Sequence, residues 1–147
     1  MKDYLRSGAI CKEVREFGVT LLKEGVSFVE IAEKIEKKIQ TLGGRPAFPV
    51  DIGINHIAAH DSPHFNDDRK LKKGDLVKLD LGVHINGAVT DTAVTVEIGT
   101  TNYRTLIESA EEALKNAIDL AKPGVSLGSI GRVIEKTIRG YGFSPII

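Results

Sequence analysis

The dipeptide Asn86-Gly87 constrains the fold of this chain more than any other short segment. It lies between two runs rich in β-branched residues, and a type I′ turn, which needs positive φ at both central positions, favours Asn followed by Gly. The sequence therefore predicts a two-residue hairpin loop in which Ile85 pairs with Ala88. This register fixes the partner of every residue further along both strands.

Two aspartates fall on the same face of the predicted hairpin. Counting outward from the turn places Asp80 opposite Ala93 and Asp91 opposite Gly82. The two carboxylates are then diagonal neighbours, roughly 5–8 Å apart at their Cβ atoms. Carboxylates this close repel one another unless a proton or a cation intervenes, and a pair of divalent metal ions about 3.5–4 Å apart would supply the cation. The other face of the first strand is apolar and predicts a core face: Val77, Leu79, Leu81 and Val83.

A plainer interpretation stands beside this one, because an aspartate on the solvent face of a strand is ordinarily just solvated. Two observations favour a functional site. Gly82 leaves room on the face that Asp91 occupies. Aspartate is also a poor strand residue, so two of them in an otherwise regular hairpin indicate a local rule broken for function.

The bulk composition excludes several classes of protein. At 147 residues the chain is one domain's worth, and its 20 basic and 20 acidic side chains cancel without forming a block of one sign. We therefore expect no specific nucleic-acid binding and no attraction to anionic membranes. No apolar stretch approaches the ~20 residues of a membrane span, and the N-terminus lacks the apolar segment of a signal peptide. The single cysteine, Cys11, lies in a helical pattern, which predicts a buried structural thiol and a cytoplasmic protein.

The remaining chain predicts two pairs of helices. In the first pair, one helix is expected at residues 3–23, and the next begins with a capping box at Ser27 and ends at Gly43-Gly44. In the second pair, the helices are expected at residues 102–121 and 127–139. A shift of 99 residues superposes the two pairs without a gap. Ten of the 22 residues from Gly25 to Pro46 are identical to their counterparts, where average residue usage would give about one or two. We interpret this as an internal duplication, with a second repeat beginning near residue 101.

The second repeat is unfinished in this sequence. Pro46 leads into a short strand, a histidine-rich loop and the hairpin, whereas its counterpart Pro145 is followed only by Ile146 and Ile147. The chain is therefore expected to be the first half of a longer duplicated protein, or to obtain the second sheet from a partner or from a second copy of itself.

Three histidines cluster between the short strand and the hairpin. The spacing of His56, His60 and His64 imitates a metal-binding helical face, but Pro63 interrupts such a helix. We prefer a position for His60 at the end of the short strand, near the carboxylates, where it could donate a proton or contact an oxyanion. The other two histidines are expected at the surface.

Three motifs together resemble a known family. P-A-F-P, then N-H-I-A-A-H-x-S-P, then K-x-D-x-G-V-H-I-x-G-x-x-x-D-T-A-V-T-V are similar to the N-terminal half of a type II methionine aminopeptidase in its compact archaeal form, from the first helix to the last residue. The resemblance implies an α+β, two-layer fold: half of a pseudo-symmetric pita-bread fold, with an antiparallel, hairpin-containing sheet covered by two helix pairs. Residues 1–147 would be the N-terminal half of the catalytic domain.

The resemblance also implies roles for particular residues. Asp80 would be a carboxylate ligand to one metal ion, and Asp91 would bridge two. His60 would be a catalytic histidine that contacts the substrate near the scissile amide, and Phe48 would form a wall of the pocket for the methionine side chain. The two divalent ions would be Co²⁺, Mn²⁺, Fe²⁺ or Zn²⁺, and oxygen ligands alone do not determine which of these ions binds. The reaction implied is removal of the N-terminal methionine from nascent proteins and peptides.

The other ligands of this family, one His and two Glu, together with a second histidine and a general base, belong to the half that this sequence lacks. We therefore expect the chain alone to be inactive, as a truncated form or the product of a split gene, and to need the missing C-terminal half or a self-associating copy. Two alternatives remain: an X-Pro peptidase or dipeptidase, which shares the Asp hairpin, and a non-catalytic pita-bread module that binds protein or RNA.

Overall fold

The structure is a computed structural model that describes residues 1–146. The chain forms two compact units, Met1–Thr100 and Thr101–Ile147, the last residue of which is not described. The first unit contains α1 (Lys2–Leu21), α2 (Phe28–Thr41), β1 (Arg45–Pro46), β2 (Asp51–Ile54), β3 (Leu76–Ile85) and β4 (Ala88–Glu97). The second contains α3 (Arg104–Leu120) and α4 (Leu127–Gly140).

The sheet of the first unit is antiparallel and is built around β3. Strand β4 pairs with β3 along its whole length, from Leu76 opposite Glu97 to Ile85 opposite Ala88. Because β4 occupies one edge of β3, β1 and β2 both pair with the other edge of β3. Asn86 (φ 51°) and Gly87 (φ 84°) form the turn, so the predicted hairpin and its register are confirmed.

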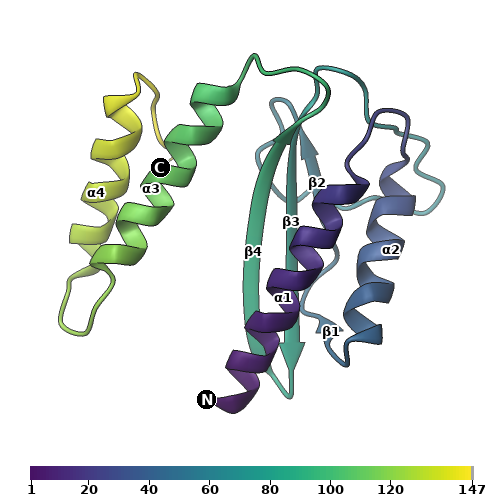
Figure 1. The fold of residues 1–147 in the computed structure, drawn as a ribbon, viewed down its shortest axis with the longest axis horizontal. Coiled ribbons are helices and arrows are strands. Elements are labelled where there is room, and N and C mark those ends of the chain that lie inside the picture. Colours follow the sequence, from purple (N-terminus) through teal and green to yellow (C-terminus); the bar gives the residue numbers. More distant parts are fainter. Residues whose placement is uncertain (147) are drawn as a thin grey trace. The chain divides into compact units, whose positions relative to one another are not determined.

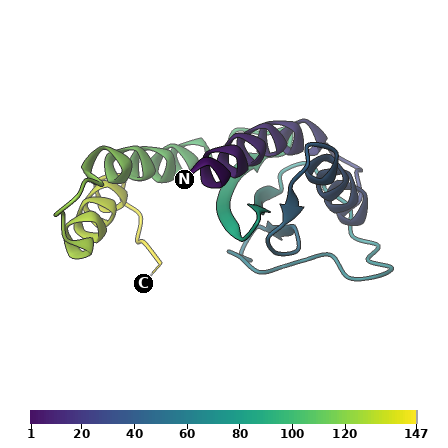
Figure 2. The same ribbon diagram turned by 90° about the horizontal axis from the view of Figure 1, so that it is seen from below.

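One face of this sheet is covered by α1 and α2 (Figures 1 and 2). Helix α2 is amphipathic, and Ser27 begins it by accepting a hydrogen bond from the Glu30 amide. Helix α2 contributes four buried side chains to the core, and each fully buried aliphatic or aromatic side chain contributes about 1.5–3 kcal/mol. The fully buried residues that form this layer are Phe28, Ile31, Ile35, Ile39, Val77, Leu79, Leu81 and Val83, so the predicted core face of the hairpin is confirmed.

The helix boundaries differ from the predicted ones by a few residues. Helix α1 ends at Leu21 rather than at residue 23, because Leu22 leaves the helical region (ψ 82°) and the Lys23 amide bonds back to the Leu21 carbonyl. Helix α3 begins at Arg104 rather than at residue 102. Helix α4 begins at Leu127 as predicted.

The second helix pair repeats the local geometry of the first at an offset of 99 residues. Both ends of α4 are displaced from those of α2 by 99 positions, and so is the C-terminal end of α3 from that of α1. The serine caps correspond, and Gly43 (φ 81°) corresponds to Gly142 (φ 83°). The hydrogen bond from the Gly44 amide to the Ile39 carbonyl recurs from Phe143 to Ile138. This agreement is what the proposed duplication predicts.

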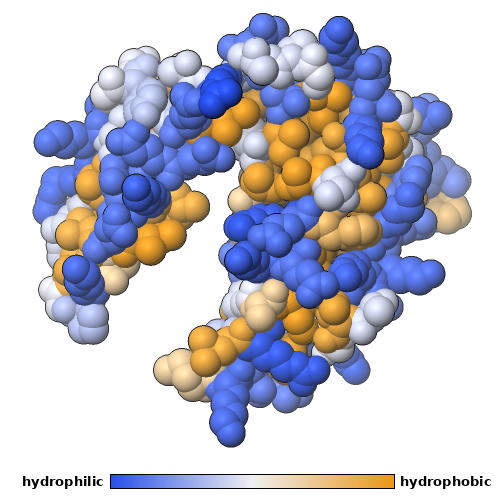
Figure 3. Space-filling model, in the orientation of Figure 1, coloured by the Kyte–Doolittle hydropathy of each residue, from blue (hydrophilic) through white to orange (hydrophobic). Residues whose placement is uncertain are grey.

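The two helix pairs differ in burial. The expectation that the helices cover the sheet holds for α1 and α2, whereas α3 and α4 form a compact unit of their own. None of the residues of α4, all of which the structure describes, is buried. Figure 3 shows apolar side chains gathered over this pair, and its exposed large apolar residues are Leu106, Leu114, Ile118 and Leu127.

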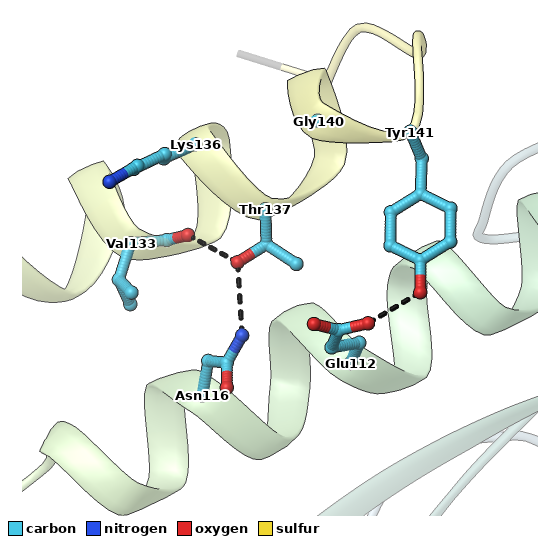
Figure 4. A pocket seen from close by; sticks show the side chains of 7 residues that line it. All are labelled: Glu112, Asn116, Val133, Lys136, Thr137, Gly140 and Tyr141. Atoms are coloured by element: carbon cyan, nitrogen blue, oxygen red, sulfur yellow. Dashed lines mark hydrogen bonds between the residues drawn. The ribbon is translucent and has the colours of Figure 1, made fainter.

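A cavity of about 670 Å³ lies between α3 and α4 (Figure 4). Asn116 donates a hydrogen bond to Thr137 across it, and the Tyr141 hydroxyl bonds to Glu112. The equivalent space in the first pair holds a longer side chain, since Lys38 corresponds to Thr137 and its ammonium contacts Glu13 at 2.8 Å. Thr137 is shorter than its counterpart Lys38, and the cavity lies outside the carboxylate site described below.

No helix within residues 1–146 combines the length and the apolarity needed to span a membrane.

Candidate metal and substrate site

Asp80 and Asp91 project from neighbouring strands onto one face of the sheet. Asp80 lies opposite Ala93 and Asp91 lies opposite Gly82, which makes the two carboxylates diagonal neighbours as predicted. Burial, followed by the negative charges of Asp91 and Asp51, raises the pKa of Asp80, and the charge of His60 opposes that rise. Asp80 therefore lies in an environment that disfavours its own negative charge.

A third carboxylate, Asp51, was missed in the sequence. It is the first residue of β2 and lies directly opposite Asp80, on the edge of β3 that β4 does not occupy. Its side chain is buried and accepts a hydrogen bond from the Ser62 hydroxyl. The alternation in Asp51-Ile52-Gly53-Ile54, which sets Asp51 and Ile52 on opposite faces, was the signal that could have found it.

His60 is placed by a returning loop, and the prediction that it ends the short strand was wrong. Strand β2 stops at Ile54 because Asn55 adopts a left-handed conformation (φ 53°) and the Ile57 amide bonds to the Ile54 carbonyl. The chain then comes back beside β2, where the Asp61 carbonyl accepts a hydrogen bond from the Ile52 amide at 2.9 Å. His60 is exposed, and its charge acts on Asp80.

Phe48 lies against the same face of the hairpin. The Ala47 amide donates a hydrogen bond to the Gly82 carbonyl at 3.0 Å, which brings the following residue over the strand. A Cβ atom added to Gly82 would overlap the Phe48 ring. The room that the glycine provides is therefore occupied by an aromatic side chain that is itself only partly buried.

The opposite face of the hairpin is fixed by α1. The Ser7 hydroxyl donates to the Val83 carbonyl at 2.8 Å, and Arg15 donates to the Thr92 hydroxyl at 2.8 Å. Cys11 is buried between these contacts, as predicted, and burial raises the pKa of its thiol. Contacts with α1 on the opposite face thus fix the strands that carry Asp80 and Asp91.

The donor set fits a carboxylate-bound divalent cation only in part. Within residues 1–146 no group of three or more His, Cys, Asp or Glu side chains is arranged to hold a metal ion. Oxygen Oδ1 of Asp80, however, is buried and has no hydrogen-bond partner among the described residues. Buried polar oxygens are rarely left so, and a cation at this position would satisfy it. The two carboxylates fit part of a metal site and leave other ligands to be supplied.

Comparison with known proteins identifies the class. The family model of metallopeptidase family M24 matches residues 2–146, and the chain belongs to this family. A methionine aminopeptidase of Methanothermus fervidus is 43% identical over 158 residues, which cover 99% of this chain and 84% of that protein. Membership in a metallopeptidase family implies divalent metal ions.

Further relatives carry the same name. A methionine aminopeptidase of Pyrococcus horikoshii is 50% identical over 143 residues, covering 97% of this chain and 48% of that protein. The predicted resemblance to archaeal methionine aminopeptidases is thus confirmed. The chain spans about half the length of this relative and of several others.

Solved structures confirm the fold. Prolidase from Pyrococcus furiosus matches with a TM-score of 0.82 and 30% identity, over 94% of this chain and 42% of that one. A methionine aminopeptidase from Thermotoga maritima matches with a TM-score of 0.88 at 24% identity, over 95% and 59%. The predicted fold class, mixed α and β of the pita-bread type, is confirmed.

Proposed function

We propose that this chain supplies the N-terminal half of the catalytic site of a methionine aminopeptidase, which removes the first methionine from peptides and nascent proteins. The observation that carries the proposal is the pair of carboxylates at Asp80 and Asp91, held on one face of a rigid hairpin in a metallopeptidase fold. The names of the archaeal relatives support the substrate class. Because Cys11 is a free thiol, a reducing cytoplasm is the compartment we propose.

In this proposal each site residue keeps the role that the resemblance implies. Asp80 and Asp91 would hold two divalent ions, with Asp91 bridging them; Co²⁺, Mn²⁺, Fe²⁺ and Zn²⁺ are the candidates. Such ions polarise an amide carbonyl and lower the pKa of a bound water. His60, near the carboxylates but exposed, would contact the substrate beside the scissile amide. The ring of Phe48 would form one wall of the methionine pocket.

We further propose that the chain requires a partner for activity. Two carboxylates are too few to hold a reactive pair of ions, and a third, Asp51, is already hydrogen-bonded by Ser62. The longer relatives contain about as much sequence again. A C-terminal half of that kind, or a second copy of this chain, would complete the ligand set.

The test is hydrolysis of a Met-Ala-Ser tripeptide in the presence of Mn²⁺ or Co²⁺. We expect no turnover by the chain alone, and turnover when it is co-expressed with the C-terminal half of the Pyrococcus horikoshii relative. Asp91→Asn should abolish that turnover. Turnover by the chain alone would refute the need for a different partner half. If the wild-type chain and the C-terminal half form a soluble complex that does not hydrolyse the tripeptide, the proposed activity is refuted.

One observation favours a second candidate, hydrolysis of X-Pro dipeptides. The prolidase of Pyrococcus furiosus has the same fold over this chain at 30% identity. The two activities are distinguished by substrate, because an Ala-Pro dipeptide offers no N-terminal methionine. Preference of the complemented enzyme for Ala-Pro over Met-Ala-Ser would favour the second candidate.

A further inference from the structure

The loop that carries His60 is fixed by an arginine outside the three motifs. Arg69 donates to both oxygens of Asp61, from Nη1 at 2.7 Å and from Nη2 at 3.0 Å. It also donates to Asp67, from Nη2 at 2.7 Å and from Nε at 3.0 Å. One guanidinium therefore connects Asp61, which follows His60, with Asp67. Bidentate pairs of this kind fix direction as well as distance.

The arginine is itself anchored to the core. Its guanidinium carbon lies 4.7 Å from the centre of the Phe28 ring, and its carbonyl accepts a hydrogen bond from the Phe28 amide at 3.1 Å. Phe28 is fully buried at the start of α2. The side chain of Asp67 is 1% exposed, whereas those of Asp61 and Arg69 are 18% and 33% exposed. The clamp thus connects a rigid, buried base to a partly exposed loop.

His60 needs such support because its backbone is in the left-handed region (φ 60°), which side chains other than glycine adopt at a cost. Three contacts hold the residues beside it. Arg69 holds the Asp61 side chain, Ile52 holds the Asp61 backbone, and Asp51 holds the Ser62 hydroxyl. Of these, only the arginine anchors the loop to α2 rather than to β2.

We propose that Arg69 is a positioning residue, which bridges Asp61 and Asp67 and thereby holds His60 at the Asp80–Asp91 carboxylate site. The inference rests on the proposed role of His60 toward the substrate. It adds a residue that contacts neither metal ligand nor substrate and acts only through the loop.

The first readout is hydrogen exchange at the Ile52 amide in the full chain, since this amide bonds to the Asp61 carbonyl. Arg69→Met keeps most of the side-chain length and the apolar contact with Phe28 but removes the positive charge and the guanidinium N–H donors. We expect it to accelerate Ile52 exchange about tenfold or more relative to the Leu79 amide in the core. In Arg69→Lys, the exchange rate of the Ile52 amide should lie between those of the wild type and Arg69→Met. Arg139→Met, which breaks an exposed ion pair with Glu135 on α4, should change nothing.

The second readout reports the position of the imidazole. Low concentrations of Mn²⁺ should broaden the ring signals of His60 in the wild-type chain, because paramagnetic relaxation falls steeply with distance. Arg69→Met should reduce that broadening severalfold, Arg69→Lys should restore part of it, and Asp91→Asn should remove it.

The two readouts fail separately. If Mn²⁺ leaves His60 unaffected in the wild type, Mn²⁺ does not bind near His60 in the chain without its partner, and the clamp is judged by Ile52 exchange alone. If Ile52 exchange and the His60 signals of Arg69→Met match those of the wild type, the clamp is refuted. Should Arg69→Met fail to fold, Asp61→Asn removes the ionic contact while keeping Asp67 paired, and unchanged exchange at Ile52 would refute the inference as well.

Discussion

Among single residues, Asp80 carries the clearest energetic cost. Its Oδ1 atom is buried without a hydrogen-bond partner among the described residues, and its pKa is raised by burial and by two neighbouring carboxylates. A raised carboxyl pKa means that the folded state binds a proton more readily than the unfolded one. The folded state therefore loses stability as the pH rises from the ordinary pKa of an Asp to the raised pKa of Asp80.

Asp80→Asn is accordingly expected to stabilise the metal-free chain at pH 7. The amide removes one of three close negative charges and can donate to a neighbouring carboxylate, so we expect a gain of about 1 kcal/mol. The measurement is urea unfolding with a chelator present. Addition of Mn²⁺ should stabilise the wild type and leave the variant unchanged. A variant less stable than the wild type without metal would contradict this explanation.

Asp67 behaves in the opposite way. Hydrogen bonds from Arg69 lower its pKa from 3.8 to about 2, so the folded state binds protons less readily than the unfolded one. The resulting stability is present above the ordinary pKa and is lost as the pH falls from about 4 to 2. We expect this pair to account for about 1–2 kcal/mol of the acid-induced loss, after allowance for the partial exposure of Arg69.

Urea unfolding of Asp67→Asn at pH 6 and at pH 2.5 tests this assignment. The variant should lose less stability between the two pH values than the wild type does. The matched control is Glu135→Gln, because both side chains of the Glu135–Arg139 ion pair are exposed. Equal pH dependence in the wild type and in Asp67→Asn would show that the acid sensitivity comes from elsewhere.

The sequence made some site residues predictable and concealed others. Asp80 and Asp91 could be placed because a two-residue turn fixes the partner of every residue in its hairpin. Phe48 and His60 were proposed as site residues from the motifs in which they lie. Asp51 was not found although the alternation of β2 indicated its face, and Arg69 was not found because its partner Asp61 lies in a loop that leaves β2 and returns beside it. No local periodicity encodes such a return.

At the level of elements, the same distinction explains the errors. Helix α2 has a serine cap, one apolar stripe and a terminal glycine, and each of these signals was correct. His60 was assigned to a strand end because Ile52 and Ile54 alternate with Gly53 and Asn55, yet the left-handed Asn55 ends the strand at Ile54, six residues before His60. A positive φ at a residue other than glycine gives little warning in a sequence.

The contact between Gly82 and Phe48 supports a prediction about β3. Gly82→Ala places a methyl group where the Phe48 ring lies, so the ring must move off the strand. Overpacking of this kind costs about 1–3 kcal/mol. Thermal unfolding of the variant measures the loss, and nuclear Overhauser contacts of the Phe48 ring with β3 should disappear.

Gly131→Ala is the matched control for that experiment. A Cβ atom at Gly131 meets nothing within 4 Å, and the residue lies inside α4. The same substitution should therefore stabilise its helix by about 0.5–1 kcal/mol. If Gly82→Ala is as stable as the wild type, the space opposite Asp91 is not filled by the ring in solution.

For the whole molecule, the difference in burial between the two helix pairs has a direct consequence. Leu114 and Ile118 on α3 are 59% and 63% exposed, and Leu127 on α4 is 84% exposed. Apolar residues gathered in this way favour association, either with a complementary half or with a second copy. The apolar surface of the second unit is where we expect the chain to bind such a partner.

Sedimentation equilibrium over a range of concentrations tests that expectation. The wild-type chain should associate as its concentration rises, and the double variant Leu114→Lys/Ile118→Lys should weaken association at least tenfold. Leu5→Lys, at a 70% exposed position of α1, is the control and should have no effect. A wild-type chain that stays monomeric at the highest soluble concentration would contradict the prediction.

The offset of 99 residues also makes the molecule its own reference. The Ile35 amide in the buried helix has a counterpart at Ile134, with the same two following residues (Glu and Lys), a corresponding serine cap and the same terminal glycine conformation. Local propensity is not matched, because Gly128 and Gly131 replace Val29 and Ala32, so the comparison of the two amides must allow for about 1 kcal/mol per glycine before the remainder is assigned to tertiary burial. The ratio of their exchange rates, read along both helices in one sample, would measure residue by residue how much stability a helix gains from the sheet beneath it.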